Sequence, residues 1–69
     1  MNLVKNVAKN VEEKRKKLGI SVDRLSKAAN ISLSTLNKLR RGEAAYLRIE
    51  TVYSLAKALG CSMDELVAE

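Results

Sequence analysis

The sequence predicts an all-α fold, a compact domain of five short helices. Its 69 residues contain no Pro, Trp, Phe or His and only three Gly, whereas strand-rich domains normally use more aromatic residues and turn formers. Apolar residues recur three or four positions apart over several stretches, which is the spacing of one helix face. The stretches end at residues that tolerate a left-handed backbone, namely Gly19, Asn30, Gly42 and Gly60.

The first helix is expected over residues 3–18, and the fourth carries residues 49–59 and ends before Gly60. The other three helices each begin after a serine that can accept a hydrogen bond from the first turn, at Ser21, Ser32 and Ser62. Glu65 follows Ser62 by three residues, the spacing of a capping box. The side chains expected to face the core are Val4, Val7, Val11, Leu18, Val22, Leu25, Ala29, Leu36, Leu39, Ile49, Val52, Ala56 and Leu59, and those of the last helix, Met63, Leu66 and Val67, are expected to face the core or a partner.

Composition excludes several classes of protein. The single Cys61 cannot form an internal disulfide, and we interpret it as a small packed residue rather than a redox switch. Without His, a metal or haem site is not expected, and we predict no cofactor and no small-molecule ligand. Apolar runs reach only three or four residues, whereas a membrane span needs about 20. We therefore expect one cytoplasmic domain over residues 1–69, with no membrane contact.

Positive charge is concentrated in the first two thirds of the chain. The net charge is +5, with +4 in residues 1–20, +4 in residues 21–42 and −3 in residues 43–69. A pI near 9.7 with the basic residues clustered is typical of nucleic-acid binding, although a lysine-rich helix face can equally be a solvated surface. The basic cluster at residues 14–17 ends a helix, where cations also interact favourably with the helix dipole.

Two short helices joined by residues 29–32 have the form of a helix-turn-helix, in which the second helix enters the DNA major groove. With Leu36 and Leu39 assigned to the core, the opposite face of that helix forms one contiguous stripe. Its members are Leu33, Ser34, Asn37, Lys38 and Arg41. Asn can bind adenine through two hydrogen bonds, Lys can donate to guanine, Ser is adaptable, and an apolar side chain can contact a thymine methyl.

The sequence resembles the phage Cro and repressor class of helix-turn-helix proteins over residues 11–67, with residues 3–10 as an extension of the first helix. The resemblance rests on the order and spacing of short segments: Leu18-Gly19-Ile20-Ser21, Ala29-Asn30-Ile31-Ser32-Leu33-Ser34-Thr35-Leu36, Arg41-Gly42, Ile49-Glu50-Thr51-Val52, Leu55-Ala56-Lys57-Ala58-Leu59-Gly60 and Asp64-Glu65-Leu66. It implies a five-helix domain that binds double-stranded operator DNA, usually as a homodimer on a palindrome.

By position, the resemblance also implies roles for individual residues. The base-reading positions are Leu33, Ser34 and Lys38, with Thr35 and Asn37 beside them. The phosphate-contacting region contains Arg41, the backbone at Gly42 and the loop up to Arg48. Two of these residues have a second interpretation. Leu33 can pack against the turn, and Tyr46 can cover the core instead of reaching a phosphate, the role that we slightly favour for Tyr46. A dimer interface is a further possible role for Met63, Leu66 and Val67.

The chain departs from the family pattern at four places. Val22 stands where many members have a Gln that supports the DNA contact, and Asn30 replaces the usual turn Gly. The loop at residues 43–47 is about one residue longer than typical. The Arg–Glu pair that commonly links the first and third helices is replaced by two cations, Arg15 and Arg40, which would be costly to bury unpaired. We expect Glu12, Glu50 or Glu65 to pair with one of them, or one to swing out to a phosphate.

From these observations we predict that the chain is a sequence-specific DNA-binding transcriptional regulator. We interpret it as a repressor that binds a promoter as a homodimer. The 69 residues are expected to leave no room for an effector-binding domain. The alternative is an antitoxin-like or adaptor module that keeps the fold and binds another protein, favoured by Val22 in place of Gln and by the apolar Leu33. An enzyme is not expected, because no spacing indicates a nucleophile and its base.

Overall fold

A computed structural model describes residues 2–44 and 46–69, and within them it contains five α-helices and no strand. The helices are α1 (Leu3–Leu18), α2 (Val22–Ala29), α3 (Leu33–Arg40), α4 (Ile49–Leu59) and α5 (Met63–Val67). The all-α prediction and the predicted helix order are confirmed. In this described part of the chain, none of the helices has the length and apolar character required to cross a membrane.

The helices begin and end where the local sequence predicts. The hydroxyls of Ser21, Ser32 and Ser62 each accept a hydrogen bond from the backbone N–H three residues later. Ser62 and Glu65 form both hydrogen bonds of the predicted capping box. Asn30 ends α2 in the left-handed conformation, at φ 56°, which Asn adopts several times more often than most residues that have a Cβ. The tight turn between α2 and α3 is therefore formed without glycine.

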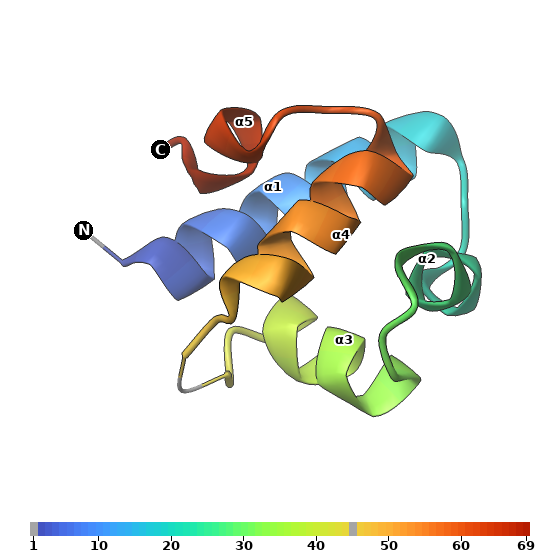
Figure 1. Cartoon of the computed structure of the whole chain (residues 1–69), viewed down its shortest axis with the longest axis horizontal. Helices are drawn as coiled ribbons and strands as arrows, with labels where there is room; N and C mark the ends of the chain where they lie inside the picture. Colours follow the sequence, from blue (N-terminus) through green and yellow to red (C-terminus); the bar gives the residue numbers. More distant parts are fainter. Residues whose placement is uncertain (1, 45) are drawn as a thin grey trace.

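The arrangement of the helices places α3 on the outside of the molecule (Figure 1). The long helix α1 packs against α3, α4 and α5, while α2 packs against α3 and α4. In Figure 1, α3 forms the lower edge of the molecule and α5 lies over α1 at the opposite side. The apolar core lies between these helices and consists of Val7, Ala8, Val11, Leu25, Ala29, Leu36, Leu39, Val52, Leu55, Ala56, Leu59 and Leu66.

Two residues predicted to face the core are instead exposed. Leu18 is 53% exposed at the last position of α1, and Ile49 is 72% exposed at the first position of α4. Both follow the periodicity of their helices, but periodicity gives only the direction of a side chain about the helix axis. It does not show whether a neighbouring helix extends far enough to cover the end. Conversely, Ala8 and Leu55 are buried although the apolar pattern did not single them out.

The short helix α5 is held on α1 by two asparagines that the sequence analysis did not identify. Asn10 donates from Nδ2 to the carbonyl oxygens of Leu66, at 2.9 Å, and Ala68, at 2.7 Å. Asn6 donates to the carbonyl oxygen of Val67 at 3.4 Å. These bonds satisfy carbonyl groups at the end of α5 that no longer have a partner inside the helix.

Candidate nucleic-acid interface

Most of the predicted reading residues lie exposed along α3. Ser34, Thr35 and Lys38 are exposed, and Leu33 is exposed although it is apolar. Leu36 and Leu39 are buried on the opposite side of the helix. The Thr35 hydroxyl accepts a hydrogen bond from the Ser32 hydroxyl at 2.7 Å, which ties it to the start of the helix. The structure therefore offers a polar face on α3 with one apolar side chain at its beginning.

Asn37 differs from its neighbours because it is half-buried and its side chain is already bonded. Its Oδ1 accepts a hydrogen bond from Nη1 of Arg40 at 3.0 Å. Arg40 lies one helical turn further along α3, on the side that packs against α1. Asn37 is thus at the border between the exposed stripe and the contact with α1.

A single carboxylate on α1 pairs with both arginines that the sequence left without a partner. Glu12 accepts hydrogen bonds from Arg15, at 2.9 Å from Nε and 3.2 Å from Nη2. It also accepts bonds from Arg40 on α3, at 2.8 Å from Nε and 3.2 Å from Nη2. The expectation that a carboxylate pairs with these cations is confirmed, and of the candidates named it is Glu12.

The electrostatics of this cluster keep the Glu12 carboxylate ionised. Hydrogen bonds from Arg15 and then Arg40 lower the pKa of Glu12 from 4.5 to about 2, and partial burial opposes them only in part. The bond to Glu12 raises the pKa of Arg15. The Arg15 side chain also donates to the carbonyl oxygen of Ile20, at 2.7 Å, in the segment between α1 and α2. The cluster therefore links α1, the start of the helix-turn-helix and α3.

The predicted phosphate-contacting residues surround the end of α3 and the following loop. Arg41 is exposed and pairs with the equally exposed Glu43 at 3.1 Å, an arrangement that contributes little to stability. Gly42 has φ 70° and nothing of the protein closer than 4.0 Å to the position of a Cβ. The predicted extra loop residue falls in a segment that includes Ala45, which lies outside the described residues.

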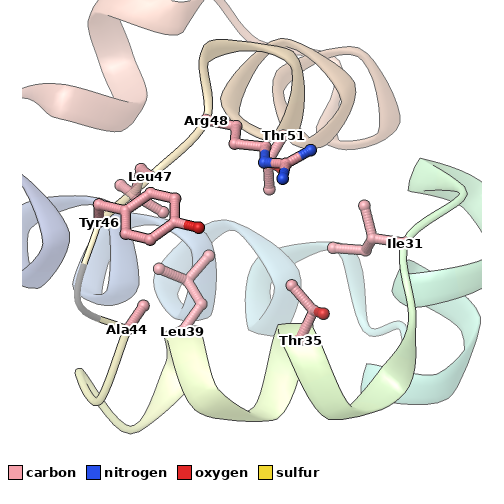
Figure 2. A pocket seen from close by; sticks show the side chains of 8 residues that line it. All are labelled: Ile31, Thr35, Leu39, Ala44, Tyr46, Leu47, Arg48 and Thr51. Carbon is pink, nitrogen blue, oxygen red and sulfur yellow. The ribbon is translucent and has the colours of Figure 1, made fainter.

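Tyr46 and Arg48 lie beside α3 at an open pocket of about 390 Å³. Figure 2 shows the Tyr46 hydroxyl and the Arg48 guanidinium pointing into the space between α3 and the start of α4, with Thr35 on the α3 side. Tyr46 is 70% exposed, so the preference for core packing was wrong. Arg48 precedes α4 without capping it through its side chain. Both residues are therefore available at the surface that α3 presents.

The basic cluster at residues 14–17 is only partly free to contact DNA. Lys16 and Lys17 are exposed, whereas Arg15 turns towards Glu12 and Lys14 lies 3.8 Å from Glu65.

The remaining apolar residues singled out from the sequence are buried to different degrees. Val22 is half-buried against the core, as predicted from its apolar character. Leu66 is fully buried, so it has no surface to offer a dimer partner, while Met63 and Val67 are half-buried. Cys61 is half-buried, and burial raises the pKa of its thiol.

The residue that sequence reasoning underrated is Glu12, which it named only as one of three candidates. The available signal was its position three residues before Arg15 on the same helix, a spacing at which side chains meet. The bond across to Arg40, 28 residues away, had no signal of this kind. The fold brings the two together because α1 packs against α3.

The chain is similar in sequence to known helix-turn-helix proteins. A family model described as the Cro/C1-type HTH DNA-binding domain matches residues 10–68. A curated relative, an uncharacterized HTH-type transcriptional regulator of Haemophilus influenzae, is 37% identical over 60 residues, which make up 87% of this chain. The chain spans 58% of the length of that relative. No solved structure gives a significant match.

Proposed function

Because the chain belongs to the Cro/C1-type helix-turn-helix DNA-binding domain family, we propose that it is a sequence-specific transcriptional regulator. In this proposal α3 enters the major groove of double-stranded DNA, and the protein represses transcription by occupying an operator within a promoter. The observation that carries the proposal is the exposed polar face of α3, flanked by Arg41, Tyr46 and Arg48. Base edges in the major groove present distinct donors and acceptors, which such a face can distinguish.

Each predicted residue has a role in this complex that suits its position. Ser34, Lys38 and Asn37 contact base edges, and Leu33 contacts a thymine methyl, with Thr35 beside them. Arg41, Arg48 and the Tyr46 hydroxyl, together with the backbone at Gly42, contact phosphates. Phosphate contacts set the position of the protein on the duplex, whereas base contacts select the sequence.

The regulator acts as a homodimer on a palindromic site. A surface suited to the dimer lies where Leu3 and Ile49 are exposed beside the half-buried Met63 and Val67, and Tyr46 lies at the border between this surface and α3. Together with neighbouring residues they line an apolar groove of about 420 Å³. Exposed apolar groups in one place are typical of an interaction surface. The same groove would serve the alternative, an adaptor module that binds another protein.

Selection of bound sequences from a random DNA duplex pool, at about 150 mM salt, tests the proposal because screening at this ionic strength limits non-specific binding. We expect enrichment of a palindrome whose half-sites are about 10 base pairs, or a multiple, apart. Replacement of Lys38 by Ala should weaken binding by about 1–3 kcal/mol per half-site and relax the preference at one position of each half-site. Lys57→Ala, an exposed lysine of α4, is the matched control. A pool without enrichment would favour the adaptor module.

A further inference from the structure

Asn37 stands at the end of a chain of hydrogen bonds that begins on α1. Glu12 holds Arg40 through two of its guanidinium nitrogens, Nε at 2.8 Å and Nη2 at 3.2 Å. The third nitrogen, Nη1, donates to Oδ1 of Asn37 at 3.0 Å. One edge of the planar Arg40 guanidinium therefore donates to the Glu12 carboxylate, and the remaining nitrogen donates to the Asn37 amide oxygen. Because Glu12 is also held by Arg15 on the same helix, the carboxylate that positions the donor facing Asn37 is itself fixed on α1.

The chemistry of this contact determines which way the amide of Asn37 faces. A guanidinium group carries N–H donors and no acceptor. The group that faces Arg40 must therefore be the amide oxygen, and the NH₂ group must point to the other side. An Asn side chain on an exposed helix would be able to turn either way, whereas here one orientation loses a charge-assisted hydrogen bond.

This orientation bears on which base the side chain can recognise. An Asn that binds adenine accepts from N6 and donates to N7 at the same time, so it needs both its oxygen and its NH₂ group at the base edge. Guanine presents two acceptors, O6 and N7, and thymine presents O4. With one lone pair of its oxygen occupied and the oxygen turned towards Arg40, the amide has both N–H donors left for a base edge. These donors match the acceptors of guanine and thymine.

We propose that Glu12 and Arg40 are positioning residues that turn the N–H donors of Asn37 to the base edge, so that it favours guanine or thymine over adenine at the base that it contacts. This inference rests on the proposed function, since it assumes that α3 reads base pairs. It adds a specificity determinant outside the reading surface, because Glu12 lies on α1 and its hydrogen bonds to α3 are those with Arg40.

The test compares the sites selected by the parent with those selected by variants of the cluster. Asn37→Ala first identifies the base position that depends on Asn37, as the position that loses its preference. Arg40→Lys keeps the positive charge, but a single ammonium cannot bond both oxygens of Glu12 and the amide in the same fork geometry. We expect guanine or thymine at that position in the parent, and about a tenfold gain of adenine relative to guanine in the variant.

Glu12→Gln gives a second readout, because it changes α1 and leaves every residue of α3 in place. It weakens the hold on Arg40, and we expect the same position to shift in the same direction. Lys38→Ala is the control on α3 itself, since it should change a different position and leave the Asn37 position as it is. Helical circular dichroism and thermal unfolding show that each variant remains folded.

Three results would overturn the inference while leaving the proposed function intact. They are adenine at the Asn37-dependent position of the parent, no position that depends on Asn37, and folded Arg40→Lys and Glu12→Gln variants with unchanged base preference. A parent that enriches no sequence would instead refute the proposed function, and the inference would fall with it.

Discussion

At the scale of single residues, Glu12 is the side chain that joins Arg15 and Arg40 in one hydrogen-bonded cluster. It is 20% exposed, and it holds two guanidinium groups that would otherwise repel each other close to the core. A partly buried cluster of this kind is costly to break, because removing the carboxylate leaves two cations that share no counter-charge. The cluster fixes the positions of α1, the segment between α1 and α2, and α3 relative to one another.

The pKa of Glu12 predicts how stability depends on pH. Its pKa is about 2 in the folded chain, against an ordinary value of 4.5, so the folded state binds this proton more weakly than the unfolded state. The contribution is complete above about pH 4.5 and is lost as the pH falls towards 2. Because solvent reaches part of the group, we expect it to amount to about 2 kcal/mol, less than the full shift implies.

Chemical denaturation between pH 6 and pH 2 measures this contribution. The parent should lose stability over the acidic range, while Glu12→Gln should start lower and show a shallower pH dependence. The matched control is Glu13→Gln, because Glu13 is the exposed neighbour on the same helix. Equal pH dependence in the parent and in Glu12→Gln would contradict the assignment.

At the scale of elements, the attachment of α5 depends on polar contacts as well as on the buried Leu66. A helix of five residues is too short to be stable alone. Its beginning is stabilised by the capping box of Ser62 and Glu65, and its end by Asn10 and Asn6 on α1. The same two elements thus meet through apolar packing at the centre and hydrogen bonds at the edge.

Removal of the Asn10 amide should loosen α5 selectively. Asn10→Ala leaves the carbonyl groups of Leu66 and Ala68 without their protein donor, and we expect a loss of about 1 kcal/mol in the free energy of unfolding. Hydrogen exchange should quicken in α5 more than in α2. Lys9→Ala, at the exposed neighbouring position of α1, serves as the control. Unchanged exchange in α5 would show that apolar packing alone holds it.

At the scale of the whole molecule, the uneven charge predicts a strong dependence of DNA binding on salt. A dimer that makes about 6–10 phosphate contacts should lose on the order of 10³–10⁵ in affinity between 50 and 200 mM salt. Arg41→Ala should weaken binding to all duplexes alike and reduce the slope of log affinity against log salt by about 1 per protomer, or about 2 for the dimer. Titrations at several salt concentrations, with specific and random duplexes, measure both effects. A loss confined to one sequence would contradict a phosphate role for Arg41.

Local signals in the sequence were sufficient to predict the helices, the turn and which face of α3 is exposed. Serine caps, left-handed residues and apolar spacing act over three or four neighbours, so Ser32, Asn30 and Leu36 could each be interpreted without knowing the rest of the fold. The direction of Lys38, away from Leu36 and Leu39, follows from the same periodicity. Its contact with a base remains a prediction.

Only the tertiary structure decided how far each helix is covered and which distant groups meet. Ile49 and Leu18 have the spacing of core residues but lie at helix ends that are left exposed. The pairing of Glu12 with Arg40, and through it the orientation of Asn37, joins residues on different helices. Local sequence specifies the conformation of each segment through short-range sterics and capping, whereas these contacts exist only because the helices pack against one another in three dimensions.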